Sequence, residues 1–554
     1  MPALAAGKII IRGGYKMARK LIALTISTAL LITTLLSGCG GGDTQKKDGG
    51  AEPAKTETTA PAKSEAKDMT LIFAQGADPR SLDPAYFDDG ESSKVAGNIF
   101  EGLLKYKSDS TDLEPCLAES WEVSSDAKEY TFKLRQNVKF HDGTPFNADA
   151  VKFSVERQLP PNVKEDMPYA SFTFGPVEKV EKVDDYTVKF FLKEPYTPFL
   201  ANLAMTQAAP IVSPEGVKKF GDKFVENPVG TGPFKFVKWD KGQSITLERN
   251  EEYWGGKAKA SKVVFKFTKE NSVRASELMT GAVDMIDGID PNDVKKLEDS
   301  KMQVFKDKGM NINYLCFNTS RAPFNDPKLR EAVTRAINRD ELVKFLYQGY
   351  ADVATSVMPN FIPGYNKDVK PYDYDVEKAK ALLKEAGKEN LKIKIISYSN
   401  PRPYNPVNGQ KLAEAVQNYL SKVGITATID IYPWTEYKPK IDQGEGDLAF
   451  YGWIGDNGDA DNFLSLLDSK EIKSTLNSAK YANPEVDKLL AKARSLPNGD
   501  ERNKAYQDMQ ALVLVDAPWV PISHALTLTA ASPKIKNFKF HPTGNVFLKD
   551  VEKE

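Results

Sequence analysis

The chain has 554 residues, of which 41% are hydrophobic and 27% are charged. This length exceeds what one ordinary hydrophobic core fills, so we expect two or three domains. The formal net charge is only −1, which removes the electrostatic argument for a nucleic-acid-binding protein.

The first 38 residues have the organisation of a secretory signal peptide. Basic residues are present and acidic ones are absent, and we expect translation to start at Met17, which opens a basic segment. Leu21 to Leu36 is an uncharged, mostly apolar run of the length typical of a signal peptide. The alternative, a membrane-spanning helix, needs a longer run.

Leu36-Ser37-Gly38-Cys39 follows at once and resembles a bacterial lipobox, in which the cysteine thiol receives a lipid and becomes the new N-terminus. Residues 40–68 contain no aromatic residue and no Leu, Ile or Val. Such a segment cannot bury enough apolar surface to fold. We therefore predict a lipid anchor at Cys39 and a flexible tether to residue 68 that spans about 30 Å.

From Met69 to about residue 270 the chain is predicted to form short strands separated by turns. Alternation is clear at Tyr130, Phe132 and Leu134. Two cysteines, Cys116 and Cys316, lie in apolar contexts. An extracytoplasmic setting would allow one disulfide between them, but the contexts favour two separate buried thiols.

After residue 315 helices appear. Asp326-Pro327 is typical of a helix start, and apolar residues at 329, 332, 333, 336 and 337 share one face, which predicts a single helix to Val343. A second helix follows in VEKAKALLKEAG and ends at Gly387.

Residues 391–453 alternate strand, helix, strand, helix and strand, which predicts a parallel sheet. Ligands of open parallel sheets bind outside the carboxyl ends of the strands. Arg402 and Asp456 each lie within three residues of such an end. One cation and one anion are thus predicted to face the same crevice, although a simple ion pair between them is the alternative.

The loop YGWIGDNGDADNF (451–463) holds three aspartates. Asp459 and Asp461 are interpreted as loop and capping residues, because the loop lacks the spacing of a calcium site. His141 in KFHDGTPF is interpreted as a turn residue, and GTGPFKF (230–236) as a structural turn with no phosphate-binding role.

Enzyme motifs are missing from the sequence. The three histidines, His141, His524 and His541, are far apart, and no HExxH, CxxC, GxSxG or GxxxxGK[ST] pattern occurs. Nothing suggests a nucleophile paired with a base. We predict a binding protein without catalytic residues, metal or other cofactor.

Five stretches, taken together and in order, resemble the extracytoplasmic solute-binding proteins of ABC importers for peptides and nickel, and among them the dipeptide binders. The likeness runs from Met69 to the C-terminus. The stretches are PCLAESWEVSSDAKEYTFKLRQNVKFHDGTPFNADAVKFSVER (115–157), PVGTGPFKF (228–236), FNDPKLREAVTRAINRDELV (324–343), PRPYNPVNGQKLAE (401–414) and GWIGDNGDADNF (452–463).

The resemblance implies an α/β, two-lobed, type II periplasmic-binding-protein-like fold. An extra strand-rich subdomain would belong to the first lobe, and strands at 315–318 and 520–523 would cross between the lobes. The implied parts are a first-lobe core (69–96, 228–314 and 523–554), the extra subdomain (97–227) and the second lobe (315–522).

The resemblance also implies the ligand contacts. Arg402, in R-P-Y-N-P, would bind the peptide carboxylate, and Asp456, in W-x-G-D, would bind the α-ammonium. A guanidinium matches a carboxylate with two hydrogen bonds, and an aspartate offers several acceptor sites to an ammonium. Backbone near Trp453 and Gly90 would hold the peptide main chain, and Tyr404 would add a further contact.

By this resemblance the chain would be a monomeric lipoprotein, at the outer face of the cytoplasmic membrane or in the periplasm, that captures dipeptides for an ABC permease and its ATPase. Its contact with the membrane would be through the lipid alone, and nucleic acid would not be a partner. Alternatives are a binder of longer peptides, a metal-chelate or haem importer subunit, and a peptide-sensing receptor. Arg402 favours the dipeptide binder, because a binder of longer peptides does not need to hold the peptide carboxylate at this fixed position in the site.

Overall fold

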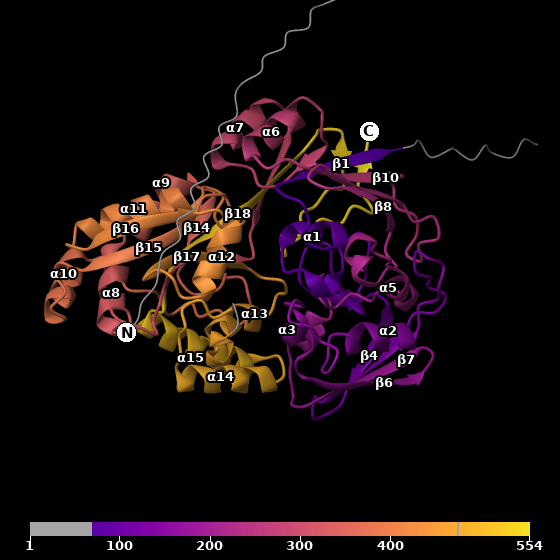
Figure 1. The fold of residues 1–554 in the computed structure, drawn as a ribbon, viewed down its shortest axis with the longest axis horizontal. Coiled ribbons are helices and arrows are strands. Elements are labelled where there is room, and N and C mark those ends of the chain that lie inside the picture. Colours follow the sequence, from indigo (N-terminus) through magenta and orange to yellow (C-terminus); the bar gives the residue numbers. More distant parts are fainter. Residues whose placement is uncertain (1–68, 474–475) are drawn as a thin grey trace, which may run out of the picture. The chain divides into compact units, whose positions relative to one another are not determined.

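The structure is a computed structural model that describes residues 69–473 and 476–554. The predicted signal peptide, the lipidation of Cys39 and the tether to residue 68 lie outside the described residues. Figure 1 shows the described elements in two groups, one coloured indigo to magenta and one mainly orange, and the long strand β18 (Trp519–Ala531) serves both groups.

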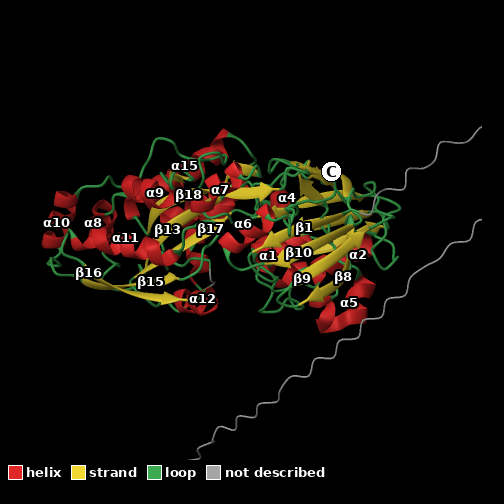
Figure 2. Cartoon of the chain, turned by 90° about the horizontal axis from the view of Figure 1, so that it is seen from above, coloured by secondary structure: helices red, strands yellow, loops and turns green. Residues whose placement is uncertain are grey.

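A mixed sheet of twelve strands runs through both groups (Figure 2). Along its main path the order is β16 (Thr426–Tyr432), β15 (Lys392–Tyr398), β17 (Leu448–Ile454), β13 (Asn311–Phe317), β18, β11 (Met285–Ile286), β1 (Thr70–Gln75), β10 (Lys262–Phe267), β9 (Ser244–Arg249) and β8 (Phe234–Asp240). Beside this path, β12 (Gln303–Lys308) and β14 (Ala351–Val353) pair with β18.

Smaller sheets accompany the large one. A four-stranded antiparallel sheet contains β4 (Ala118–Val123), β5 (Glu129–Leu134), β7 (Thr187–Leu192) and β6 (Val177–Asp184). Two strand pairs are β2 (Leu104–Tyr106) with β3 (Leu113–Pro115) and β19 (Ile535–Lys536) with β20 (Glu552–Lys553). The strands predicted from alternation before residue 270 are therefore confirmed.

The helices of the first part of the chain are short: α1 (Gly90–Ala96), α2 (Ala148–Glu156), α3 (Ala170–Phe174), α4 (Phe199–Asn202), α5 (Pro214–Phe220), α6 (Asn271–Met279) and α7 (Pro291–Asp299). Those of the later part are α8 (Pro327–Ala336), α9 (Arg339–Tyr347), α10 (Val376–Glu385), α11 (Gly409–Ser421), α12 (Trp434–Asp442), α13 (Asp461–Leu464), α14 (Pro484–Ser495) and α15 (Asp500–Asp516). Single 3-10 turns are η1 (Pro84–Tyr86), η2 (Gly221–Glu226), η3 (Ser465–Leu467) and η4 (Ser469–Ile472).

Two large hydrophobic clusters divide the described residues. The first core draws on residues from Leu71 to Phe265, Met285 and the last strands, and the second core on residues from Met310 to Ile522. A third, smaller cluster packs α6 and α7 against β18. The exact domain boundaries stay a prediction.

The predicted strand and helix alternation after residue 391 is confirmed. β15 pairs in parallel with β16 on one side and with β17 on the other. β13 runs antiparallel to both β17 and β18, so the sheet as a whole is mixed. In its other half, β1 pairs in parallel with β10 and with β11. Because β15 and β17 are parallel, their carboxyl ends lie at one edge of the sheet, and the loops that carry Arg402 and Asp456 both begin there.

The prediction of one helix from Asp326 to Val343 is wrong. The chain forms α8 and α9, because Ile337 adopts an extended conformation and the Asn338 side chain accepts a hydrogen bond from the Glu341 amide. Asn338 thus caps a new helix. The apolar face continues across the break, and for that reason hydrophobic spacing alone could not reveal it.

Two further predictions are confirmed. Cys116 and Cys316 are both buried and unbonded to one another. The glycines of GTGPFKF are structural, since a Cβ on Gly230 or Gly232 would come within 2.2 or 2.7 Å of the Ile99 carbonyl oxygen. His141 lies in the adjoining turn, where its Nε2 is 3.0 Å from the Gly232 oxygen, and burial lowers the pKa of this histidine to about 4.

Candidate functional site

Arg402 lies in the loop between β15 and α11. Its main chain forms a two-way bridge with Asn405, and its guanidinium carbon lies 4.0 Å from the centre of the Trp434 ring, at the start of α12. Stacking on an indole holds the plane of a guanidinium while leaving its N–H groups available at the edge.

The charge of Arg402 has no carboxylate partner among the described residues: its guanidinium forms no ion pair there, and its Nε is buried without a hydrogen-bond acceptor. Burial lowers the pKa of Arg402, but nearby Tyr404 and Glu91 raise it above its ordinary value overall, so the side chain stays charged. An unpaired, partly buried cation is costly to keep and indicates a place for an anion.

Tyr404, two residues further on, is 4% exposed, and its hydroxyl also has no partner in the described part of the chain. Its ring lies against Gly452 of β17, where an added Cβ would meet the ring at 2.3 Å. Gly452 is therefore required for this close approach, which fixes Tyr404 beside Arg402.

Asp456 follows β17 and is 9% exposed. Its carboxylate accepts hydrogen bonds from the Tyr169 hydroxyl at 2.5 Å and from Gln207 Nε2 at 2.8 Å. Both donors are neutral and belong to the first part of the chain, so this carboxylate joins the two cores without being neutralised. Burial raises the pKa of Asp456 to about 7, and the charge of Asp88 adds to this effect.

Trp453 lies where the two cores meet, and Gly90 is the first residue of α1. Trp453 packs against both clusters, and its Nε1 donates to Asn462 Oδ1 at 2.8 Å. Gly90 is exposed at the first position of α1, and open space surrounds its Cβ position. The charges of its neighbours Asp88 and Glu91 raise the pKa values of Asp456 and Arg402 respectively.

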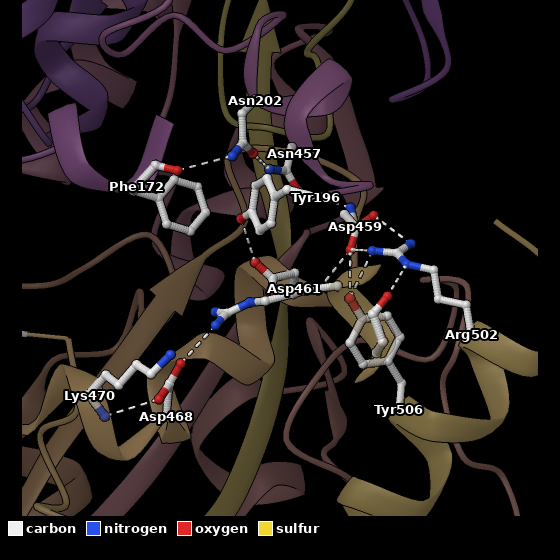
Figure 3. Close-up of polar contacts among 12 residues, drawn as sticks. Phe172, Tyr196, Asn202, Asn457, Asp459, Asp461, Asp468, Lys470, Arg502 and Tyr506 are labelled. Carbon is white, nitrogen blue, oxygen red and sulfur yellow. Dashed lines mark hydrogen bonds and ion pairs between the residues drawn. The ribbon is translucent and has the colours of Figure 1, made fainter. Parts of the chain in front are cut away.

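The other two aspartates of the loop are paired (Figure 3). Asp459 forms an ion pair with Arg502 at 2.8 Å and accepts from the Asp461 amide at 2.9 Å. Asp461 forms an ion pair with Arg494 at 2.6 Å and accepts from Tyr196 at 2.9 Å. Their interpretation as loop residues agrees with this geometry, although no sequence pattern indicated the arginine partners. No cluster of metal-binding side chains occurs among the described residues.

Three residues near the site were missed from the sequence: Tyr169, Gln207 and Trp434. Tyr169 and Gln207 are more than 240 positions from Asp456 along the chain, so no local pattern connects them to it. Trp434 had a usable signal, because it follows β16 at the same sheet edge as Arg402.

Comparison with known proteins identifies the family. The family described as bacterial extracellular solute-binding proteins, family 5 Middle, matches residues 112–475, which is more than half of the chain. The chain belongs to this family.

Curated relatives of this family-5 protein cover nearly its full length. Haem-binding protein A of Haemophilus influenzae is 36% identical over 94% of this chain and 97% of the relative. The dipeptide-binding protein of Escherichia coli is 35% identical over 88% of this chain and 95% of the relative.

Solved structures show the same fold. The periplasmic binding protein DppA of Helicobacter pylori, in complex with the peptide STSA, has a TM-score of 0.80 and 36% identity over 88% of this chain and 98% of that one. The dipeptide-binding protein of a Pseudoalteromonas species, in complex with Met-Leu, has a TM-score of 0.82 and 28% identity over 88% of this chain and 100% of that one.

This family-5 protein therefore has the type II periplasmic-binding-protein fold expected from its sequence, and it is a solute-binding protein of an ABC importer, not an enzyme. Within the described residues, no helix combines the length and apolar character that crossing a membrane requires.

Proposed function

We propose that this protein captures dipeptides for an ABC importer by holding the two charged ends of the peptide. Arg402 binds the C-terminal carboxylate and Asp456 binds the α-ammonium. Tyr404 supplies a further hydrogen bond, and the backbone near Trp453 and Gly90 binds the peptide main chain.

The observation that carries this proposal is the pair of uncompensated charges. Arg402 has no ion-pair partner among the described carboxylates, and Asp456 contacts the neutral donors Tyr169 and Gln207. Asp459 and Asp461, in the same loop, are each neutralised by an arginine. Because leaving a charge unpaired and buried is unfavourable, this contrast supports a role for Arg402 and Asp456 in holding a zwitterionic ligand.

Two fixed charged groups also limit ligand length. Each added residue extends a peptide by roughly 3.3–3.6 Å, which exceeds the tolerance of a hydrogen bond. Dipeptides are therefore expected to bind best, tripeptides less well, and free amino acids hardly at all.

The anchor and the partners belong to the same proposal. Lipid on Cys39 and the tether to residue 68 would keep the monomeric binding protein beside its permease and ATPase, at the outer face of the membrane. A sensing role would use the same ligand site with a different partner.

Calorimetry tests the ligand assignment with a free dipeptide and its N-acetylated form, on wild type and Asp456→Asn. Truncating one partner of a buried charge pair costs about 2–5 kcal/mol. The free dipeptide should bind the variant roughly 30-fold to several thousand-fold more weakly, whereas the weak binding of the acetylated form should hardly change.

Asp459→Asn is the matched control, because it makes the same substitution three residues away on a carboxylate that Arg502 already neutralises. It should keep the wild-type preference for a free amine. Unchanged affinity of Asp456→Asn for the free dipeptide would show that Asp456 is an ordinary loop residue.

Haem is a second candidate ligand, favoured by the 36% identity to haem-binding protein A. A haem titration followed by absorbance, with and without saturating dipeptide, separates the candidates. Saturable haem binding that dipeptide displaces would place haem at the same site.

A further inference from the structure

The loop that carries Arg402 is attached to the second core by a row of buried side chains. Asn313 of β13 donates to the Tyr347 hydroxyl at 2.9 Å, and that hydroxyl donates to Asn405 Oδ1 at 2.9 Å. Asn405 Nδ2 in turn donates to the Tyr398 hydroxyl at 3.0 Å. All four side chains have 0% exposure. We call these four residues the Asn405 clamp.

The clamp reaches Arg402 through the main chain. The Arg402 amide donates to the Asn405 oxygen at 3.0 Å, and the Asn405 amide donates to the Arg402 oxygen at 2.8 Å. Since the Asn405 side chain is held by a donor at one end and an acceptor at the other, the turn cannot shift without leaving buried polar groups unpaired.

The clamp also reaches Arg402 through its aromatic support. The Tyr398 ring meets the Trp434 ring edge-on, with centroids 5.7 Å apart and an interplanar angle of 82°. Trp434 is the ring on which the Arg402 guanidinium stacks. The last member of the clamp thus limits the position of both the backbone and the side chain of Arg402.

A clamp of this kind is poorly explained by stability alone. Apolar side chains of similar shape would fill the same core without the cost of burying four polar groups. The hydrogen bonds instead connect β13, α9 and β15 to one loop, and that loop carries the cation without a partner. Rigid support of this type is what accurate placement of a binding group requires.

We propose that the Asn405 clamp positions Arg402 and thereby sets the preference for ligands with a free C-terminal carboxylate over those with a neutral C-terminal amide. This inference rests on the proposed function, in which Arg402 binds that carboxylate. The clamp members are positioning residues, since they act on the ligand through Arg402.

Calorimetry with a free dipeptide and its C-terminal amide tests the clamp. Tyr347→Phe removes the hydroxyl that joins Asn313 to Asn405 and leaves the ring in place. The free dipeptide should bind this variant roughly 5- to 30-fold more weakly, the effect of losing one or two buried hydrogen bonds. Binding of the amide should hardly change, and Tyr347→Phe should have no further effect when Arg402 is replaced by methionine.

Tyr481→Phe is the matched control. It removes the hydroxyl of another buried tyrosine of the second core, bonded to Asp516. The control should keep the wild-type ratio of the two affinities. If Tyr347→Phe does not fold, Asn405→Ala provides the same comparison.

The outcomes separate the two proposals. A wild-type protein that binds the free dipeptide and the amide equally well contradicts the role of Arg402 itself. The other case is a wild-type protein that prefers the free carboxylate. If the clamp variants then bind both ligands equally more weakly, or keep the full preference, the positioning role of the clamp is contradicted while the role of Arg402 stands.

Discussion

At the scale of single residues, the three aspartates of the loop after β17 differ in the partners of their carboxylates. Asp456, Asp459 and Asp461 have the same chemistry and lie within six positions of one another. Only the latter two have arginine partners, whereas Asp456 is bonded to Tyr169 and Gln207. Neutral donors orient a carboxylate without cancelling its charge, so Asp456 keeps its attraction for a cation.

The first prediction concerns pH. The pKa of Asp456 is raised to about 7, so the carboxylate gains a proton, and loses its attraction for an ammonium, as the pH falls below 7. The Kd for a free dipeptide should increase by up to about tenfold for each pH unit below that value. Calorimetry between pH 5 and pH 8 measures the change.

The groups that face Asp456 define the controls for this titration. They include Tyr169, Tyr106 and Asp88, and burial together with the charge of Asp456 raises the pKa values of the two tyrosines well above their ordinary value. Asp456→Asn should abolish the pH dependence of the Kd, whereas Asp88→Asn should only shift the pH at which the Kd changes. An equally steep dependence in Asp456→Asn would assign the titration to another group.

At the scale of elements, ion pairs fix the loop after β17 to the C-terminal helices. Arg494 of α14 binds Asp461 and also Asp468, at 2.6 and 2.8 Å. Arg502 of α15 binds Asp459 (Figure 3). Because the loop is held at its far end, its near end can keep Asp456 in one place.

Asp461→Asn should lower the free energy of unfolding by about 1.5–3 kcal/mol, the range for hydrogen bonds to a charged group. The Asp461 side chain is nearly inaccessible, while Arg494 keeps Asp468 as a second partner. Urea unfolding at pH 8 measures the change.

Asp456→Asn is the comparison for this prediction, because this substitution should not lower the free energy of unfolding. The folded protein holds the Asp456 proton more tightly than the unfolded chain, so ionisation of this group removes stability as the pH rises from about 4 to about 7. The asparagine side chain does not ionise, so Asp456→Asn avoids this destabilisation and should be at least as stable as wild type at pH 8. A loss as large as that of Asp461→Asn would contradict the assignment of Asp456 as unpaired.

The segment before α4 also joins the two cores. Tyr196 donates to Asp461, the Thr197 amide donates to the Arg494 oxygen at 2.8 Å, and the Thr197 hydroxyl donates to the Leu496 oxygen at 2.6 Å. These contacts exist only when the cores lie together.

Tyr196→Phe should therefore weaken the binding of the free and of the N-acetylated dipeptide by the same factor, roughly 3- to 10-fold. The reason is that the variant loses one hydrogen bond that holds the two cores together. Parallel titrations of the two ligands provide the measurement. A change in their ratio would mean that Tyr196 acts on the ligand ammonium.

At the scale of the whole molecule, the two cores share strands of one sheet. β18 pairs with β13 at one end and with β12 at the other, so it passes from the second core to the first. Few shared segments between two cores are typical of hinge closure. Small-angle scattering should give a smaller radius of gyration with saturating dipeptide than without it. An unchanged radius, with binding verified in the same sample, would exclude a hinge of useful amplitude.

The anchor leads to the last prediction. Cys39→Ala removes the only thiol of the predicted lipobox, so the protein should leave the membrane fraction. The tether separates residue 39 from the folded part, and dipeptide affinity should stay at the wild-type value. Cys116→Ala is the matched cysteine control and should keep membrane association. Equal membrane association of Cys39→Ala and wild type would exclude lipidation at this position.

The sequence by itself determined the parts of this protein that depend on local order. Alternation and helix spacing predicted β15, α11, β16 and β17, because side-chain periodicity reports directly on which face is buried. The positions of Arg402 and Asp456 just after parallel strands then placed both at one sheet edge. Motif order predicted the family.

Tertiary structure decided whether each charge has a partner, and hence which charges remain for a ligand. Arg494 and Arg502 come from helices after the loop, and Tyr169 and Gln207 come from the other core. Such contacts depend on how distant segments pack, which periodicity does not record. The break between α8 and α9 was hidden for a related reason, because a cap at Asn338 interrupts the backbone while the apolar face continues.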